Sequence, residues 1–178
     1  QQDGLTIHQL VPSEVGFDAL LEEVFAIREA WLDTKSHPMD AYLFELHPQD
    51  GAEAKRFFLA RDQHRAVGYL SCVPSRMGAR WTASTLARTP DAPKGTSEAL
   101  LCGAIRALSE MGVDEFSLGV VTLAGVDPDT EGDLSRLRTR MRWLYSHPSG
   151  PVHNANLLSF KKKFHPDWVE PALVAVHT

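Results

Sequence analysis

The sequence contains few cysteines and no long hydrophobic run, and each absence excludes a class of protein. Only two of its 178 residues are cysteines, Cys72 and Cys102. Two thiols cannot build a disulfide framework, nor can they alone supply a zinc ligand set. Because both lie in apolar stretches, we expect buried free thiols and a reducing, cytoplasmic-side location. No run of about 18 apolar residues is present, so the sequence predicts no transmembrane helix.

Several common active-site signatures are also absent. The sequence has no Gly-x-Gly-x-x-Gly motif and no Walker loop, which argues against dinucleotide and P-loop nucleotide binding. It has no Gly-x-Ser-x-Gly elbow and no His/Cys/Asp spacing typical of a zinc site. We therefore expect neither a serine hydrolase triad nor a bound metal.

Charge is negative overall and positive only in places. The formal net charge of -5 excludes a globally basic nucleic-acid-binding protein. Arginines gather in residues 136–142, and lysines in Lys161–Lys163. A local patch of this kind can hold one phosphate-rich end of an RNA. Two solvated helix faces would give the same pattern, and charge alone leaves both interpretations open.

The spacing of apolar residues predicts a mixture of strands and helices. Helical spacing predicts helices at residues 17–32 and 96–111, with Thr96 as the N-cap of the second and Gly112 as its end. We expect strands at residues 5–10, 56–60, 66–73, 80–87, 113–121 and 170–177, and further helices at 134–145 and 154–164. This order predicts an α/β (α+β) fold with a mixed central sheet flanked by helices, the layout of the acyl-CoA N-acyltransferase (GNAT) fold.

Two segments carry residues suited to chemistry. Residues 88–98 read as a strand end, a rigid Pro/Gly turn and a helix start, and a helix N-terminus attracts anionic or polar ligands. Residues 160–164 place three consecutive lysines near the C-terminal end, where cations stabilise negative charge on a substrate or leaving group. Together the two segments indicate an acyl-type transferase.

Four segments resemble, in the same order, the motifs of one family. They are Trp-Leu-Asp-Thr-Lys at 31–35, the Arg-Thr-Pro-Asp-Ala-Pro-Lys-Gly turn at 88–95, the strand with Leu-Gly at 111–125, and Phe-Lys-Lys-Lys-Phe at 160–164. The chain resembles, over about residues 29–176, the C-terminal, aminoacyl-tRNA-dependent domain of phosphatidylglycerol lysyltransferases. This family also includes related lipid aminoacyltransferases.

The resemblance implies a single GNAT-like domain over residues 1–178, serving as the C-terminal unit of a longer tandem protein. It implies a reaction that moves an amino acid from charged tRNA to a lipid hydroxyl. The expected partners are the acceptor end of an aminoacyl-tRNA and the lipid acceptor. Membrane association is expected through segments upstream of this sequence, and self-association stays open. Because an aminoacyl ester is already activated, no cofactor is expected besides the aminoacyl-tRNA donor.

The lysines are the first candidates for catalysis. A cation can stabilise the tetrahedral oxyanion and the departing ribose oxygen, and a desolvated lysine can also donate a proton. Since positions two apart do not share a helix face, only one of Lys161 and Lys163 is expected to point into the site. The family pattern favours Lys163. A solvated basic helix is the alternative.

Arg88 is the third catalytic candidate. Its guanidinium can bind the terminal adenosine phosphate or orient a carboxyl group through two parallel hydrogen bonds. The alternative is a surface ion pair with Asp91 or Glu98.

Five further residues are candidates for substrate binding: Glu98, Gly95, Thr96, Asn154 and Gly119. Glu98 is expected to bind the amino group of the amino acid. The alternative is that its carboxylate only interacts favourably with the helix dipole, as acidic residues in a first helical turn often do. Gly95 and Thr96 are expected to supply backbone N–H groups, and a simple helix cap is the alternative. Asn154 precedes the lysines and is expected to position the acceptor, while Gly119 lies in the matched strand.

The sequence departs from the family pattern at four positions, and two alternative functions therefore stay open. Thr85 stands where the family usually has an acid, Lys94 where it has Asn, Thr122 where it has Pro, and Leu158 where it has Arg. One alternative is an acyl-CoA-dependent N-acyltransferase, although its Gln/Arg-x-x-Gly-x-Gly/Ala pyrophosphate loop is absent. The other is a non-catalytic binding domain of the same fold.

Overall fold

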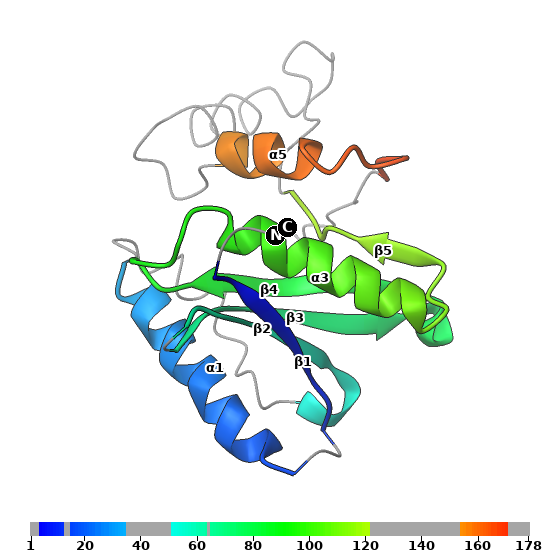
Figure 1. Cartoon of the computed structure of the whole chain (residues 1–178). Helices are drawn as coiled ribbons and strands as arrows, with labels where there is room; N and C mark the ends of the chain where they lie inside the picture. The colour runs from blue at the N-terminus through cyan, green and yellow to red at the C-terminus, as the bar shows by residue number, and fades with distance from the viewer. Residues whose placement is uncertain (1–3, 13–14, 35–50, 64, 122–153, 171–178) are drawn as a thin grey trace, which may run out of the picture. The chain divides into compact units, whose positions relative to one another are not determined.

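The structure is a computed structural model that describes residues 4–12, 15–34, 51–63, 65–121 and 154–170 (Figure 1). The chain divides into two compact units, Gln1–Gly119 and Val120–Thr178. The predicted helix at 134–145, the arginines at 136–142 and nearly all of the predicted strand at 170–177 lie outside the described residues.

The first unit is built on a mixed sheet of five strands in the order β1-β2-β3-β4-β5. The strands are β1 (Thr6–Leu10), β2 (Arg56–Arg61), β3 (Ala66–Ser75), β4 (Arg80–Arg88) and β5 (Glu115–Ser117). Strands β1 to β4 pair with one another antiparallel, whereas β5 runs parallel to β4. The predicted strands β1 to β4 and the mixed sheet are therefore confirmed.

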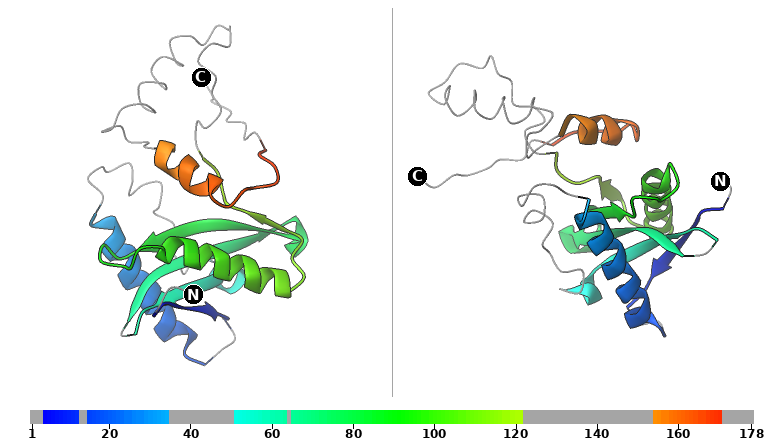
Figure 2. Two further views of the ribbon diagram at one scale, coloured as in Figure 1. Left: turned by 45° about the horizontal axis from the view of Figure 1, so that its top comes forward. Right: turned by 90° about the vertical axis from the view of Figure 1, so that its left-hand side faces the viewer.

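Helices α1 (Phe17–Leu32) and α3 (Thr96–Glu110) cover opposite faces of this sheet (Figure 2). Side chains of a strand alternate between its two faces. Gly68 of β3 accordingly lies against Thr96 of α3, whereas the next residue, Tyr69, belongs to the core on the α1 side. That core gathers Leu21, Val24 and Ile27 of α1 with residues of four strands, namely Leu10, Phe57, Leu59, Tyr69 and Ala87.

Both helices begin at the predicted residues, but the predicted N-cap of α3 is wrong. Gly95 is the N-cap, with φ 87° and ψ 0°, and Thr96 is already helical. Glycine adopts this left-handed conformation without the steric cost of a Cβ. The Thr96 hydroxyl instead donates a hydrogen bond to the Pro93 carbonyl oxygen at 2.7 Å.

The predicted strand at 113–121 is confirmed but is too long, because β5 covers only Glu115–Ser117 and Val120 is exposed. The hydroxyl of Ser117 accepts a hydrogen bond from the backbone N–H of Gly119 at 3.2 Å. Such local side-chain bonds compete with a strand ladder. Gly119 then takes a φ of +79°, which ends the extended conformation.

The two thiols differ in exposure, against the expectation that both are buried. Cys72 of β3 is fully buried, and burial raises the pKa of its thiol to about 12. Cys102 of α3 is exposed, because the buried stripe of that helix runs through Leu100, Leu101, Ala104 and Leu108. Two short 3-10 turns, η1 (Ala52–Ala54) and η2 (Arg76–Gly78), complete the first unit.

In the second unit, α5 spans Asn154–Lys162 and ends two residues before the predicted Phe164. Backbone N–H groups of the next residues make tighter, i to i+3 bonds: Lys163 to Phe160 and Phe164 to Lys161. His165 has a φ of +46° and precedes Pro166, a residue that disfavours helix at the position before it. No helix within the described part of the chain is long and apolar enough to cross a membrane.

Candidate functional site

The turn between β4 and α3 is held by a chain of hydrogen bonds. The N–H and hydroxyl of Thr89 both donate to the Val67 carbonyl, at 2.9 and 3.4 Å. The N–H of Ala92 donates to Thr89, and the N–H and hydroxyl of Thr96 donate to Pro93. These bonds fix the turn against β3 and orient the first turn of α3. The Thr96 N–H is used within the turn, which argues against its predicted role as a ligand donor.

Gly68 lets this turn approach β3 closely. A Cβ at position 68 would lie 2.9 Å from Cγ2 of Thr96, 3.2 Å from the Ala87 carbonyl oxygen and 3.3 Å from Cβ of Arg88. Both Thr96 and Arg88 therefore meet at one backbone position. The structure thus brings together three predicted site residues, Arg88, Gly95 and Thr96.

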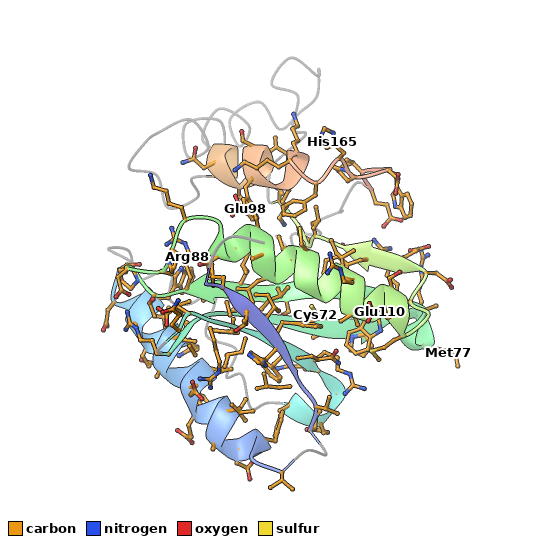
Figure 3. The ribbon with its side chains drawn as sticks, viewed as in Figure 1. Cys72, Met77, Arg88, Glu98, Glu110 and His165 are labelled. Carbon is orange, nitrogen blue, oxygen red and sulfur yellow. The ribbon has the colours of Figure 1, made fainter. Side chains whose placement is uncertain are left out.

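Arg88 is exposed at the end of β4. Asp91, one predicted ion-pair partner, pairs instead with Arg65. Hydrogen bonds from Thr89 and Arg65 hold the pKa of the Asp91 carboxyl below its usual value. Within the described parts of the chain, no ion pair involves Arg88. Figure 3 shows Arg88 and Glu98 beside the start of α3, an arrangement suited to an anionic or polar ligand.

Strand β4 extends well beyond its parallel neighbour. The ladder with β5 covers only Arg80–Thr82, and no other described strand pairs with the rest of that edge of β4. A bulge follows, because Cys72 pairs with Ala83 whereas Ser71 pairs with Thr85. Backbone groups on this edge can bond an extended ligand as an added strand would. Thr85 stands where the family usually has an acid. Its backbone N–H donates a hydrogen bond to the Ser71 hydroxyl at 3.2 Å.

In the second unit, the two candidate lysines have different surroundings. Nζ of Lys161 donates a hydrogen bond to the Val120 carbonyl oxygen at 3.0 Å, and burial lowers the pKa of Lys161 to about 8. Lys163 follows the end of α5 and is exposed, with Nζ 5.7 Å from the centroid of the Phe160 ring. Lys161, rather than the lysine favoured by the family pattern, is thus the desolvated one.

The structure gives no side-chain contact for two further candidates, Asn154 and Gly119. Asn154 is the first residue of α5, and its side chain lies outside the described residues. Gly119 forms the turn after β5. Arg88, Gly95, Thr96, Glu98 and Gly119 belong to the first unit, and the lysines and Asn154 to the second. Their joint action in one site stays a prediction.

The sequence analysis missed two buried polar residues on the α1 side of the sheet, Arg28 and Tyr69. Arg28 is 8% exposed and Tyr69 is 1% exposed. The position of Arg28 was a readable signal, because it continues the buried stripe of Leu21 and Val24 at helical spacing.

A sequence model for the C-terminal domain of phosphatidylglycerol lysyltransferases matches residues 1–176. The chain belongs to this family. A search of curated proteins found no match. Among the described residues, no group of three His, Cys, Asp or Glu side chains has the arrangement of a metal site.

Solved structures confirm the GNAT-like fold of this lysyltransferase-family domain. L-PGS from Bacillus licheniformis matches with a TM-score of 0.62 and 20% identity, covering 93% of this chain and 48% of that one. The C-terminal domain of a putative lysylphosphatidylglycerol synthetase from Agrobacterium fabrum gives 0.59 and 19%, with the same coverage. An aminoglycoside acetyltransferase from an uncultured soil metagenomic sample, in complex with sisomicin, gives 0.58 and 15%, covering 98% and 95%. The chain spans about half the length of the Bacillus licheniformis and Agrobacterium fabrum proteins.

Proposed function

We propose that the chain is the aminoacyltransferase unit that moves an amino acid from aminoacyl-tRNA to a lipid hydroxyl. The observation that carries this proposal is the match of residues 1–176 to the C-terminal domain of phosphatidylglycerol lysyltransferases. The donor is then the acceptor end of an aminoacyl-tRNA, and the acceptor is a lipid such as phosphatidylglycerol. In this proposal the reaction takes place at the cytoplasmic side of a membrane.

The donor end fits the turn between β4 and α3. The first turn of α3 offers backbone N–H groups and the positive end of the helix dipole. Arg88, exposed beside it, adds a guanidinium that matches a phosphate or carboxylate. In our proposal these groups bind the terminal adenosine phosphate, and Glu98 binds the amino group of the amino acid.

Lysine provides the proton and the charge stabilisation. The acceptor hydroxyl attacks the ester carbonyl and gives its proton to water, and the negative charge moves to the carbonyl oxygen. When this oxyanion collapses, the ribose oxygen departs and takes up a proton. With a pKa of about 8, Lys161 is protonated at neutral pH and can donate this proton more readily than an ordinary lysine. Lys163 contributes a second positive charge.

An acyl-CoA-dependent N-acyltransferase is the second candidate. It is favoured by the match of this chain over nearly the whole length of a single-unit aminoglycoside acetyltransferase. The turn sequence opposes it, because Pro93-Lys94-Gly95-Thr96 lacks the glycine spacing of a pyrophosphate loop.

Fluorescence anisotropy with a short acceptor-stem hairpin separates the two candidates. The hairpin carries a non-hydrolysable aminoacyl amide, and acetyl-CoA is the competitor. Our proposal predicts that binding requires the aminoacyl group, resists acetyl-CoA and weakens when Arg88→Ala removes the guanidinium. Displacement by acetyl-CoA would instead assign the chain to the ordinary acyltransferases. Arg106→Ala, an exposed arginine elsewhere on α3, is the matched control for lost positive charge.

A further inference from the structure

Arg88, the cation proposed to bind the donor phosphate, has a carboxylate close to it in the sequence. The N–H of Ala92 donates a hydrogen bond to the Thr89 carbonyl at 3.1 Å, which closes a turn whose ends lie within about 7 Å of each other. Arg88 immediately precedes this turn, and Asp91 lies within it. An ion pair between the two would occupy the guanidinium that an anionic ligand needs.

The structure gives this carboxylate a different partner. Oδ2 of Asp91 accepts a hydrogen bond from Nη2 of Arg65, which belongs to the turn between β2 and β3. In the part of the chain that the structure describes, Arg88 takes part in no ion pair. The pairing of Asp91 with Arg65 therefore leaves Arg88 open to a ligand.

The register of the sheet sets these two partners opposite each other. Strands β3 and β4 are antiparallel, and Gly68 pairs with Arg88 near the end of their ladder. Continued three residues further, the same register brings Arg65 opposite Asp91. Residues directly opposite each other on antiparallel chains have side chains within reach of one another, and opposite charges there attract.

Backbone hydrogen bonds hold both partners in place. The N–H of Arg65 donates to Oδ1 of Asp62 at 2.9 Å, and the N–H of Asp62 donates to the Arg65 carbonyl at 3.1 Å. The N–H of Thr89 donates to the Val67 carbonyl at 2.9 Å, which fixes the turn that contains Asp91 against β3. The ion pair is thus built between two turns that are each secured by their own backbone.

The exposure of this pair argues against a purely stabilising role. The side chain of Arg65 is 53% exposed and that of Asp91 is 63% exposed. Exposed ion pairs contribute little to stability, because water and salt screen the two charges. The consequence for Arg88 is more direct, since a carboxylate bound to its guanidinium would compete with a phosphate for the same donors.

We propose that Arg65 is a positioning residue, which holds Asp91 away from Arg88 and so keeps the Arg88 guanidinium available to an anionic ligand. Arg65 itself does not touch the ligand. The identification of this ligand as the terminal adenosine phosphate of aminoacyl-tRNA rests on the proposed function. When Arg65 is removed, Asp91 pairs with Arg88 and competes with the phosphate.

An NMR titration of the Asp91 carboxyl tests this exchange of partners without any ligand. In the wild type, hydrogen bonds from Thr89 and Arg65 hold the pKa of this carboxyl below its usual value. Arg88→Ala is expected to leave the pKa unchanged, and Arg65→Gln to keep it low because Arg88 becomes the partner. Removing both arginines should raise the pKa above its value in either single variant. A higher pKa in Arg88→Ala alone, or no further rise in the double variant, would overturn the proposal.

Calorimetric titration with adenosine 5′-monophosphate measures the consequence for Arg88. Arg65→Gln is expected to weaken binding by about threefold, a change that the strength of an exposed ion pair allows, with an unchanged midpoint of thermal unfolding. Adding Asp91→Asn to Arg65→Gln should restore the wild-type affinity or exceed it, because the competing carboxylate is gone. If Arg65→Gln weakened binding equally in the Asp91→Asn background, Arg65 would act on the ligand directly and the proposal would fail.

Lys94→Gln is the matched control for lost positive charge. Lys94 is exposed in the same turn, and no ion pair among the described residues includes it. Its effect on affinity should be the same with or without Asp91→Asn, whereas the effect of Arg65→Gln should depend on Asp91. Arg65→Lys, which keeps the charge, should retain most of the wild-type affinity. The same dependence on Asp91 for Lys94→Gln would reduce the effect to net charge and contradict a specific role of Arg65.

The outcomes also separate this proposal from the proposed function. If the nucleotide shows the predicted dependence on Arg65 and Asp91 while acetyl-CoA displaces the aminoacyl hairpin, the role of Arg65 holds and the tRNA donor is rejected. If the hairpin binds as proposed but Arg65→Gln does not weaken nucleotide binding, the proposed function holds and the role of Arg65 is rejected.

Discussion

The turn between β4 and α3 and the lysine segment at the end of α5, Lys161–Lys163, differ in burial and hydrogen bonding. In the turn, Thr96 is fully buried, and hydrogen bonds join Thr89, Ala92 and Thr96 to neighbouring carbonyls. In the lysine segment, Lys162 and Lys163 are exposed, and Lys161 makes one described hydrogen bond from its ammonium group. Substitutions in the turn should therefore change stability first, whereas substitutions of the lysines should change transfer with little effect on stability.

Replacing Lys161 should give the largest effect. Lys161→Ala is expected to lower kcat/KM for transfer by about 100-fold or more, the usual loss when a donor to a developing oxyanion is removed. Since protonated Lys161 is the active form, the wild-type rate should fall as the pH rises through about 8. Lys162→Ala, which removes a neighbouring exposed charge, is the control. A transfer rate and pH profile unchanged by Lys161→Ala would remove this lysine from the mechanism.

Gly68→Ala should cause the largest loss of stability. Its Cβ would lie 2.9 Å from Cγ2 of Thr96 and 3.2 Å from a backbone oxygen, so we expect a loss of about 2 kcal/mol in the free energy of unfolding in urea. Thr96→Ser removes the crowded methyl and keeps the hydroxyl. The double variant should therefore recover part of the loss, and strict additivity would show that the two sites do not clash.

Thr96→Val tests the hydroxyl of the same residue. It keeps the side-chain shape and removes the hydrogen bond to Pro93, so the free energy of unfolding should fall by about 1 kcal/mol. Thr96→Ser retains that bond and should cost less. A larger loss from Thr96→Ser than from Thr96→Val would mean that the methyl, and not the hydroxyl, secures the turn.

The smallest effect concerns stability at alkaline pH. Half-burial lowers the pKa of Lys161 from 10.5 to about 8, so between these values the unfolded chain binds more protons than the folded one. Stability contributed by this group should therefore rise with pH across that window, and it is lowest below about pH 8. Urea unfolding should show this rise for the wild type relative to Lys161→Met. Parallel pH curves for the two proteins would argue against desolvation of Lys161.

The spacing of apolar residues predicts most helices and strands of the first unit. Apolar spacing correctly places α1, α3 and strands β1 to β4. It makes β5 too long, because the Ser117 hydroxyl and the left-handed Gly119 end the strand early. It also assigns the cap of α3 to Thr96, because the left-handed conformation of Gly95 depends on the whole turn.

The candidate site depends more on tertiary structure, which sequence spacing does not report. Motif resemblance identifies the turn that contains Arg88 and the lysine segment. It does not reveal that Lys161 is more buried than Lys163, nor that Asp91 pairs with Arg65. Nor does it reveal that Arg28 of α1 and Tyr69 of β3 are buried, because these two elements lie far apart in the sequence.

Transfer of a radiolabelled amino acid from aminoacyl-tRNA to phosphatidylglycerol vesicles tests the central claim most directly. The assay compares the wild-type chain with Arg88→Ala and Lys161→Ala in single-turnover reactions, with acetyl-CoA and an amine acceptor in a parallel reaction. We expect label in the lipid phase for the wild type, and its loss in both variants. Acetyl transfer from acetyl-CoA with no labelled lipid would contradict the account.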